Sequence, residues 1–510
     1  MKQYYLGIEF GSTRVKAVLI DGEHRIVKSG DYTWKSSLEN GVWTYHMEDV
    51  QTGLRTAIRN LGELPGAVSA MGISGMMHGY LAFDKDWNLL APFRTWQNTM
   101  TGEAAEQLTA EFGFNIPQRW SIAHLYQAIL NGEAHVKNIA HITTLAGYVH
   151  YLLTGENVLG VGEASGMFPI DSEALDYDAA MLEKFDALIA KYGFAWTARS
   201  VLPKVLTAGQ AAGALTQAGS TFLDGLLSAG IPFCPPEGDA GTGMTATNAV
   251  ALRTGNVSAG TSIFAMVVLE KPLSKVYQEI DMVTTPSGKP VAMVHCNNCT
   301  NDMNAWVSLL GETAKLFGAE VSTGELFTKL YQKSLEGDAD CSGVLTYNYM
   351  AGEGITHLDE GRPMVVRKPE SSFTLANFLR SQLYATMSTL KLGMDILAEE
   401  HVAIDSLTGH GGLFKTPVVG QKYMAAACRA PVTCMESAGE GGPYGMALLA
   451  SYLVQKQDGQ TLEQYLETEI FADVKRTTLA PDPEDEAGFD RYLSWYRSAL
   501  AAENAAVKAF

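Results

Sequence analysis

The first 35 positions of the chain show the alternation and short apolar runs of β-strands. Three such stretches are separated by turn residues, and Asp21-Gly22 is a typical hairpin turn. The pattern therefore predicts an antiparallel meander with strands at Tyr4–Phe10, Val15–Ile20 and Ile26–Trp34.

Beyond the meander, apolar residues recur every three or four positions in longer segments, which predicts helices. Strands and helices alternate up to about residue 250, an order typical of α/β folds. The helices expected in this half lie at Met47–Leu61, Gly102–Phe112, Ile122–Leu130 and Ala146–Leu153, and further strands at Val68–Gly72 and Leu226–Phe233.

The second half of the chain repeats this plan. Its expected strands are Asn256–Ser258, Ile263–Leu269, Val291–Val294 and Ser406–Thr408, and its expected helices are Asn301–Leu310, Thr374–Glu399, Val418–Cys428 and Glu486–Lys508. The stretch from Tyr347 to Pro369 is expected to be irregular. Since 510 residues exceed one hydrophobic core, the repetition predicts two α/β domains, residues 1–250 and 251–510.

The turn between the first two strands has the composition of a phosphate-binding turn. Gly11 allows a sharp turn and a close approach of a ligand. Successive backbone amides can form an anion-binding nest there, to which Ser12 and Thr13 add hydroxyl donors. Glu9, just before the turn, is a candidate to hold Mg²⁺, directly or through water.

A partial echo of this turn occurs at residues 257–264, Val-Ser-Ala-Gly-Thr-Ser-Ile-Phe. It contains Gly260 and Thr261 in a second strand–turn–strand pattern. Two phosphate-type hairpins, one opening each half, predict two related domains that close on one nucleotide.

Phosphoryl transfer requires a clamped triphosphate, a metal ion and a carboxylate beside the attacking hydroxyl. Asp239, in Gly238-Asp239-Ala240-Gly241, is a candidate for that carboxylate because it should follow a strand. The simpler interpretation is an aspartate that supports a turn. The position of Asp239, shortly before the second hairpin, favours the catalytic role.

A glycine cluster, Gly409-His410-Gly411-Gly412, stands between a predicted strand and a predicted helix, with Lys415 near the helix start. It is either an ordinary turn or a place where the backbone approaches an adenine ring or a phosphate. The sequence has neither a Rossmann fingerprint nor a Walker A motif. A third glycine-rich segment, 439–445, opens a helix that could pack near a nucleotide.

Candidates for sugar binding lie in the first half. Met77 and His78 follow a predicted strand, and Trp96, Gln97 and Asn98 follow a predicted hairpin. A sugar needs hydrogen-bond partners and an apolar wall, and these residue types supply both. The alternative is that Trp96 and Met77 belong to the core and that His78 binds a loop carbonyl.

Composition narrows the possible functions. The net charge of −19 disfavours binding to nucleic acid and to anionic membrane surfaces. No apolar run is long enough to span a bilayer, and no signal peptide is evident, so a cytoplasmic enzyme is expected.

Six cysteines suggest reduced thiols. Cys296 and Cys299 form a CxxC beside His295, but no second ligand pair completes a metal site, so we expect a chance spacing.

In combination these motifs resemble the FGGY family of carbohydrate kinases, members of the actin-like, ribonuclease-H-like ATPase superfamily. The resemblance covers nearly the whole chain. The segments that carry it are residues 7–13, 72–79, 96–98, 148–156, 164–166, 238–239, 259–262 and 411–413 with Lys415. Residues 72–79 are similar to the substrate loop of xylulose kinases, and residues 411–415 to the adenosine motif of ribulose kinases.

The resemblance implies two ribonuclease-H-like domains with a cleft between them, with sugar mainly in the first and ATP mainly in the second. It implies that Asp239 is the base, that Glu9 and Asp239 serve Mg²⁺, and that the protein is a homodimer. The residues implied to bind nucleotide are Gly11, Ser12, Thr13, Lys16, Gly260, Thr261, Gly411, Gly412 and Lys415. The residues implied to bind sugar are Met77, His78, Trp96, Gln97 and Asn98.

The chain departs from the family pattern at four positions. Glu9 and Asn98 stand where the family usually has Asp, Met76 where xylulose kinases commonly have Gln, and Ala240 where Asn is frequent. We therefore expect a kinase for a ketopentose-like sugar or a polyol whose identity the sequence does not name. The alternative is a nucleotide-dependent sensor or scaffold without kinase activity. A chaperone-type ATPase is disfavoured because the chain has no added peptide-binding segment.

Overall fold

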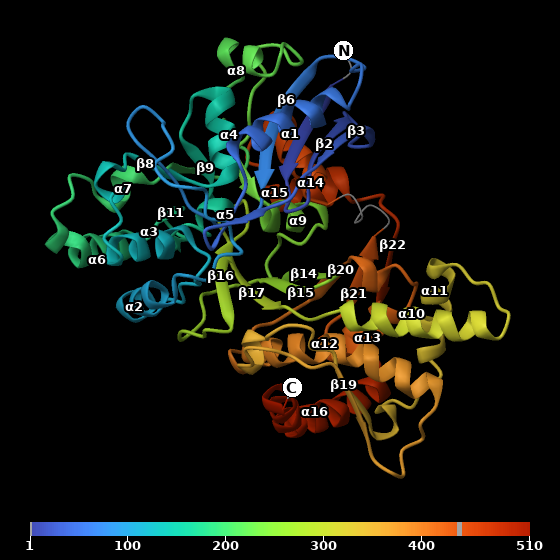
Figure 1. Cartoon of the computed structure of the whole chain (residues 1–510). Coiled ribbons are helices and arrows are strands. Elements are labelled where there is room, and N and C mark those ends of the chain that lie inside the picture. The colour runs from blue at the N-terminus through green and yellow to red at the C-terminus, as the bar shows by residue number, and fades with distance from the viewer. Residues whose placement is uncertain (1–2, 436–440, 510) are drawn as a thin grey trace. The chain divides into compact units, whose positions relative to one another are not determined.

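The computed structural model describes residues 3–435 and 441–509 (Figure 1). The chain forms two compact units, each built from separate stretches of sequence. Unit 1 comprises Met1–Leu252, Val268–Val291 and Glu440–Val474, and unit 2 comprises Arg253–Val267, Ala292–Gly439 and Lys475–Phe510. Unit 1 therefore includes two segments that lie beyond residue 251 in the sequence.

The core of unit 1 is a five-stranded sheet in the order β13-β6-β1-β2-β3. The strands are β1 (Tyr4–Phe10), β2 (Arg14–Asp21), β3 (Ile26–Thr33), β6 (Val68–Gly75) and β13 (Glu237–Gly238). The first three form the predicted antiparallel meander, while β6 runs parallel to β1 and β13 runs parallel to β6. The predicted meander is thus confirmed.

Helices cover this sheet. They are α1 (Met47–Arg59), α4 (Leu145–Thr154), α9 (Asp239–Ala246) and α14 (Gly441–Gln455). Helix α14 packs against β1, β6 and α9, and Figure 1 shows it in red beside the blue strands. Its backbone comes so close to β1 that a Cβ atom on Gly7 would lie 2.0 Å from the Pro443 carbonyl oxygen. Glycine at position 7 therefore permits this packing.

The remaining elements of unit 1 surround this core. The helices are α2 (Gly102–Phe112), α3 (Ser121–Leu130), α5 (Val161–Ala164), α6 (Ala179–Ile189), α7 (Ala198–Val201), α8 (Gln217–Phe222) and α15 (Leu462–Tyr465). The strands are β4 (Ser37–Glu39), β5 (Val42–Thr44), β7 (Leu81–Phe83), β8 (His141–Thr143), β9 (Val158–Gly160), β10 (Ile170–Asp171), β11 (Asp176–Tyr177), β12 (Lys204–Leu206) and β16 (Ile280–Thr284).

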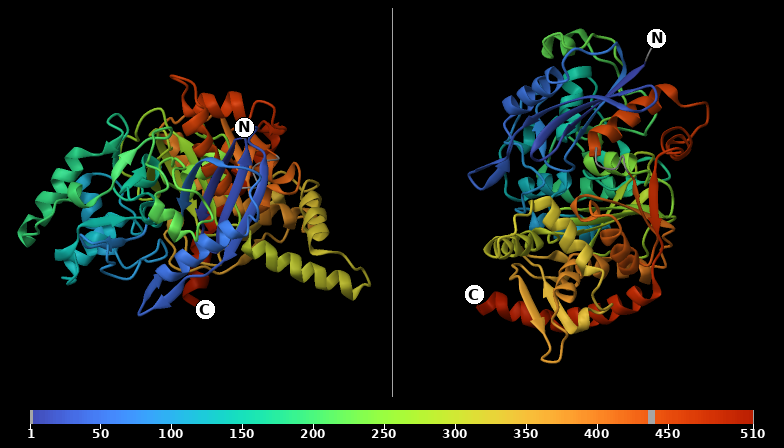
Figure 2. Two further views of the ribbon diagram at one scale, coloured as in Figure 1. Left: turned by 90° about the horizontal axis from the view of Figure 1, so that it is seen from above. Right: turned by 90° about the vertical axis from the view of Figure 1, so that its right-hand side faces the viewer.

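The main strands of unit 2 belong to a second sheet, in which they follow the order β17-β15-β14-β20-β21-β22. These strands are β14 (Thr254–Ala259), β15 (Ile263–Val268), β17 (Pro290–Cys296), β20 (Ser406–His410), β21 (Val432–Met435) and β22 (Arg476–Leu479). The helices are α10 (Asn301–Leu316), α11 (Thr323–Ser334), α12 (Leu375–Glu399), α13 (Val419–Cys428) and α16 (Pro483–Ala509). Figure 2 shows α10 and α11, in yellow, extending away from the rest of this unit.

The two sheets share one connectivity. In each, a hairpin begins the sheet and its first strand pairs in parallel with a strand that follows much later, β1 with β6 and β14 with β20. A further parallel strand continues each sheet, β13 in unit 1 and β21 in unit 2. The expected α/β fold with two related ribonuclease-H-like domains is therefore confirmed.

Two sequence-based expectations about elements are wrong. Leu226–Phe233 is a loop, because Gly225 and Gly230 adopt positive φ angles and Pro232 cannot donate a ladder hydrogen bond. Its Leu227 and Ile231 are still buried in the core, which explains its apolar sequence. The stretch 347–369 is not wholly irregular, since β19 (Met364–Arg367) pairs with β18 (Val344–Tyr347).

No helix in the described part of the chain combines the length and the apolar character needed to cross a membrane.

Candidate active site

The turn between β1 and β2 is held in shape from behind. The Gly11 amide donates to the Arg14 carbonyl (3.0 Å), which closes the turn. The Trp34 indole donates to the Gly11 carbonyl (2.8 Å), and the Tyr45 hydroxyl donates to the Ser12 carbonyl (2.6 Å). These last two bonds occupy the Gly11 and Ser12 carbonyl oxygens, which would otherwise repel a phosphate.

The exposed side of the same turn suits an anion. Ser12 and Thr13 are exposed, and their backbone amides donate to no acceptor among the described residues. Free amides and hydroxyls at a tight turn are the groups that bind phosphate oxygens. The prediction that Gly11, Ser12 and Thr13 bind phosphate is compatible with this geometry and stays a prediction.

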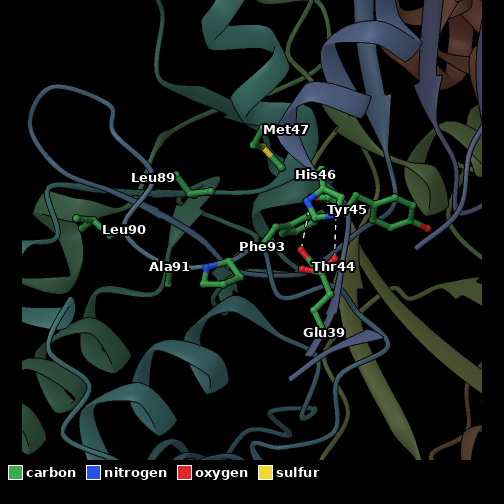
Figure 3. A pocket seen from close by; sticks show the side chains of 10 residues that line it. Glu39, Thr44, Tyr45, His46, Met47, Leu89, Leu90, Ala91 and Phe93 are labelled. Atoms are coloured by element: carbon green, nitrogen blue, oxygen red, sulfur yellow. Dashed lines mark hydrogen bonds and ion pairs between the residues drawn. The ribbon is translucent and has the colours of Figure 1, made fainter. Parts of the chain in front are cut away.

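A cavity of about 380 Å³ lies beside Tyr45 (Figure 3). It is lined by residues 44–47 and 89–93 together with Glu39, whose carboxylate pairs with His46 at 2.8 Å. Tyr45 packs on Trp34 with ring centroids 4.3 Å apart. None of the predicted site residues lines this cavity. It is linked to the turn only through Tyr45, which holds the Ser12 carbonyl.

Asp239 lies where β13 ends and α9 begins. It is the first residue of the helix, so its carboxylate lies near the helix amides. Its Oδ1 accepts hydrogen bonds from the amides of Met77 (3.2 Å) and Ala240 (3.0 Å). Its Oδ2 has no hydrogen-bond partner among the described residues, and the side chain is exposed to solvent. One oxygen is thus fixed while the other is available to a ligand.

The side chain of Asp239 is accessible to solvent, but the groups around it displace much of its hydration water. This desolvation raises its pKa to about 6, while the hydrogen bonds from Met77 and Ala240 oppose the shift. A carboxylate with such a pKa is a stronger base than an ordinary aspartate and is still ionised at neutral pH.

Glu9 lies in β1 near Asp239. Burial and the charge of Asp239 raise the pKa of Glu9 to about 8, and Lys16, its cross-strand partner, opposes the shift. A Cβ atom on Gly442 would lie 2.5 Å from Glu9 Oε1, so α14 packs directly over this carboxyl. A carboxyl whose pKa is raised by a neighbouring carboxylate lies where a cation is attracted.

The strand β6 ends at the loop that carries Met77 and His78, both nearly fully buried. His78 has a φ of 69°, unusual for a residue with a Cβ, and such local strain is common at functional sites. Its Nδ1 lies 3.1 Å from the Gly166 carbonyl, and since a carbonyl only accepts, Nδ1 donates this bond. The ring stacks on Trp120 at 6.2 Å.

The segment Trp96-Gln97-Asn98 follows Arg94, whose backbone pairs with Tyr80 just after the Met77–His78 loop. Trp96 is 39% exposed and can act as an apolar wall. Asn98 is buried: its amide group donates to the carbonyls of Trp43 (2.8 Å) and Thr95 (2.9 Å) and accepts from the Trp43 amide (2.8 Å). Asn98 therefore shapes the loop, and sugar binding through it stays a prediction.

In unit 2 the structure brings Gly260 and Thr261 next to Gly411 and Gly412. The turn after β14 is closed by the bond from the Gly260 amide to the Ser262 carbonyl (2.9 Å). Gly411 has a φ of 98°, and a Cβ atom there would lie 2.4 Å from the Ala259 carbonyl oxygen. Only glycine fits that position without strain.

Lys415 is exposed and follows the 3₁₀ turn Gly412–Phe414, before α13 begins. Its part in binding the nucleotide stays a prediction. Of the third glycine-rich segment, 439–445, residues 439 and 440 lie outside the described residues, while 441–445 form the start of α14.

The CxxC segment supports the second hairpin. Cys296 and Cys299 are buried, and burial raises the pKa of Cys299 to about 12 and that of Cys296 well above its ordinary value, so both are poor nucleophiles. The Cys299 amide donates to the Thr261 carbonyl (3.1 Å). The described residues contain no group of three or more metal-ligating side chains.

The lack of such a group among the described residues is compatible with a Mg²⁺ site. This ion usually keeps several waters and binds through one or two carboxylates and substrate phosphates. Glu9 and Asp239 match that donor set, so the residues present fit such an ion.

Sequence reasoning missed two buried carboxyls next to Asp239. Glu237 accepts hydrogen bonds from the amides of Glu163 (2.9 Å) and Gly162 (3.4 Å), and burial raises its pKa to about 8. Glu163 is itself fully buried. Both residues directly precede motifs quoted above, at 164–166 and 238–239, but periodicity does not reveal that a single polar side chain is buried.

Comparison with known proteins agrees with this geometry. Residues 4–245 match the N-terminal domain, and residues 255–454 the C-terminal domain, of the FGGY family of carbohydrate kinases. The xylulose kinase of Haemophilus influenzae is 22% identical over 96% of this chain and 99% of that protein. The glycerol kinase of Thermococcus kodakarensis is 27% identical, but the match spans only 53% of this chain and 54% of that protein.

Among solved structures, the ligand-bound xylulose kinase from Lactobacillus acidophilus superimposes with a TM-score of 0.81 at 16% identity. The match covers 98% of this chain and 99% of that one. At this identity the likeness establishes the fold alone. Because the two family domains together span most of the sequence, the chain belongs to the FGGY family of carbohydrate kinases, which places it among the phosphotransferases.

Proposed function

We propose that this protein transfers the γ-phosphate of ATP to a hydroxyl of a ketopentose-like sugar or a polyol, with Asp239 as the base. The observation that carries the proposal is the state of the Asp239 carboxylate. Two backbone amides fix one oxygen, the other is available, and the pKa is raised to about 6. Such a group can take the proton of the attacking hydroxyl at neutral pH.

In this reaction the sugar oxygen forms a bond to the γ-phosphorus as the bond to the bridging oxygen of ADP breaks. The proton of the sugar hydroxyl passes to Asp239 Oδ2. The Met77 amide, by holding Oδ1, fixes the direction from which the hydroxyl must approach. The bond between His78 Nδ1 and the Gly166 carbonyl fixes the orientation of the His78 ring, which is proposed to contribute to the sugar site.

The nucleotide phosphates would bind the turn amides of Ser12 and Thr13 in unit 1 and those around Gly260 and Thr261 in unit 2. Lys16 and Lys415 supply positive charge, and Gly411 and Gly412 allow close approach of the adenosine part. Mg²⁺, when bound, offsets the phosphate charge in such sites. Glu9 and Asp239 are the residues that would hold it, with Glu9 reaching one methylene further than an aspartate.

The test is a panel of pentuloses, hexuloses, polyols and sugar acids with ATP, Mg²⁺ and coupled detection of ADP. We expect acceptor-dependent ADP release with at least one neutral ketose or polyol, and loss of that release in Asp239→Asn with ATP binding retained. Loss of a positioned base typically lowers the rate by about 10²–10⁴-fold. Near-normal turnover in Asp239→Asn would rule out the assigned role.

The second candidate is a nucleotide-dependent sensor or scaffold of the same fold. The buried, internally bonded Asn98 favours it, because this residue offers less to a sugar than the aspartate usual in the family. ATP binding without turnover on the whole panel would support this alternative. A cytoplasmic location and a homodimeric state belong to the first proposal, and light scattering of the purified protein tests the dimer.

A further inference from the structure

Glu163 is a fully buried carboxyl in α5 that the proposed mechanism does not yet use. Its relative exposure is 0%, and within the described part of the chain neither of its carboxyl oxygens has a partner at full hydrogen-bond geometry, although the Thr144 hydroxyl lies near enough to interact with the carboxyl. Buried polar groups in native proteins nearly always have partners, since an unsatisfied one costs free energy. The missing partner of Glu163 therefore requires a physical explanation.

The location of Glu163 supplies one. A Cβ atom built on Gly238 would lie 2.4 Å from Glu163 Oε2 and 2.2 Å from Met77 Cγ. Gly238 directly precedes Asp239, so the carboxyl of Glu163 shares one small space with Met77 beside the base. Likewise, a Cβ atom on Gly166 would lie 2.7 Å from His78 Nδ1. The residues of α5 and its C-terminal end thus line the same loop that carries the sugar candidates.

The backbone of α5 is firmly held, which fixes where the Glu163 side chain begins. Glu237 accepts from the Glu163 amide (2.9 Å), and the Ser165 hydroxyl donates to the Gly162 carbonyl (2.6 Å). The Ser165 hydroxyl also accepts from the Thr284 amide of β16 (3.1 Å). A positioned side chain with an unsatisfied head group is the arrangement expected of a binding residue before its ligand arrives.

The surroundings of Glu163 also determine its protonation state. Burial raises the pKa of Glu163 well above its ordinary value, and the negative charges of Asp239 and Glu237 act in the same direction, while the Thr144 hydroxyl opposes them. A carboxyl with a raised pKa keeps its proton to a higher pH, and its protonated form offers one O–H donor together with acceptor oxygens, as a hydroxyl-bearing ligand requires.

We propose that Glu163 is a sugar-binding residue whose carboxyl forms hydrogen bonds with the hydroxyl adjacent to the one that is phosphorylated. The inference rests on the proposed function and narrows its acceptor class to compounds with a vicinal diol at the reacting end. A carboxylate group at that adjacent position is disfavoured, because it would face the negative charge of Asp239. The thioether of Met77, which lies against the carboxyl, is flexible enough to give way to the ligand.

The experiment compares Glu163→Gln with Glu163→Leu in the full-length protein. Glutamine keeps a donor and an acceptor in nearly the same volume, whereas leucine keeps only the volume. With the best acceptor of the panel, we expect Glu163→Leu to raise the KM for the acceptor by about tenfold or more, the loss of one or more hydrogen bonds. Glu163→Gln should remain within about threefold, and the KM for ATP should be unchanged in both variants.

A substrate analogue makes the test specific. The wild-type protein should discriminate against the analogue of that acceptor deoxygenated at the carbon adjacent to the phosphorylated one, and Glu163→Leu should lose most of this discrimination. Thr143→Val is the matched control, because Thr143 Oγ1 is also buried without a partner but lies against Gly147 of α4. It should change neither the KM nor the discrimination.

A readout independent of turnover is the ¹³C signal of the Glu163 carboxyl, assigned by its absence in Glu163→Gln. We expect this signal to shift when the acceptor is added. An unshifted signal, or an acceptor KM unchanged in a folded Glu163→Leu protein that still turns over, overturns the assignment of Glu163 and leaves the kinase proposal standing. If no sugar of the panel is turned over by, or binds to, the wild-type protein, both proposals fail.

Discussion

At the scale of single residues, the proposed function depends on carboxyls whose surroundings differ. Asp239 is accessible and anchored by two amides, whereas Glu9 is half-buried and Glu163 is enclosed. The motif at 238–239 made Asp239 predictable, because a carboxylate at a strand end is a recognisable pattern. No comparable pattern marks Glu163, since its burial results from the packing of α5 against the strand that ends at Gly238.

The raised pKa of Asp239 predicts how activity depends on pH. Burial raises this pKa to about 6, and the base must be ionised to accept a proton. With the active acceptor from the panel, kcat/KM should therefore fall about tenfold per pH unit below about pH 6 and be level above it. The check is a profile from about pH 5 to 8 at saturating ATP. A profile that stays level down to pH 5 would contradict Asp239 as the titrating base.

At the scale of elements, the β1–β2 turn owes its shape to side chains from elsewhere in unit 1. The sequence predicted the turn from its glycine and hydroxyls, but the residues that hold its carbonyls, Trp34 and Tyr45, lie more than 20 positions away. Hydrophobic periodicity shows that an aromatic residue is buried. Which polar atom its hydroxyl or indole reaches depends on the folded chain.

Removing one of these supports should weaken nucleotide binding. Tyr45→Phe deletes the hydrogen bond from the Tyr45 hydroxyl to the Ser12 carbonyl. We expect the KM for ATP to rise, by a factor that corresponds to about 0.5–1.5 kcal/mol, because the turn loses part of its preorganisation. The KM for the acceptor should not change.

Tyr192→Phe is the control for Tyr45→Phe, because Tyr192 is 39% exposed and outside the site. The measurement is steady-state kinetics with each substrate varied in turn. Equal changes in both KM values for Tyr45→Phe would point to a general structural effect instead.

The contact between α14 and β1 gives a prediction on stability. In Gly7→Ala the new methyl group would meet the backbone of Pro443 at 2.0 Å and that of Ala447 at 2.5 Å, so strand and helix must separate. We expect a loss of about 1–3 kcal/mol in the free energy of unfolding of unit 1, as for other overpacked cores. Gly243→Ala, in α9 where nothing lies within 4 Å of the added methyl, should leave stability equal or higher.

Urea unfolding followed by tryptophan fluorescence measures both glycine variants. If Gly7→Ala were as stable as the wild type, the close packing of α14 on β1 would be incorrect.

At the scale of the whole molecule, each unit repeats one topology but is assembled from non-contiguous segments. The last helix on the unit 1 sheet, α14, comes from residues 441–455, long after the chain has left that unit. Alternating strands and helices predicted two α/β domains and their common plan. This alternation could not predict that the chain returns to unit 1 with α14, because a helix with a given apolar pattern can pack on either sheet.

Buried carboxyls with raised pKa values also make the stability of the whole protein depend on pH. The pKa of Glu237 is about 8 in the folded protein against an ordinary 4.5, so between these values the folded protein binds its proton more tightly than the unfolded chain. Stability should therefore fall as pH rises through this window, for one group by at most about 1.4 kcal/mol per pH unit.

Glu237→Gln should reduce this slope because it removes one titrating group, although Glu9 and Glu163, with pKa values raised in the same direction, keep part of it. Denaturant unfolding at about pH 5, 6, 7 and 8 compares the two proteins. An equal slope in both proteins would show that Glu237 does not titrate in this window.

The sequence by itself determined the two related α/β halves, and it predicted the phosphate-type turns at 11 and 260 and the aspartate at 239 as site residues. These features are local: a glycine at a turn, an apolar alternation or a carboxylate at a strand end has the same meaning in any fold. The tertiary structure decided which oxygen of Asp239 is held, that Asn98 binds its own loop, and that Glu163 lies unsatisfied beside Met77. Those facts depend on the packing of segments that lie up to 162 positions apart in the sequence. Whether a polar group is buried is decided only by that packing.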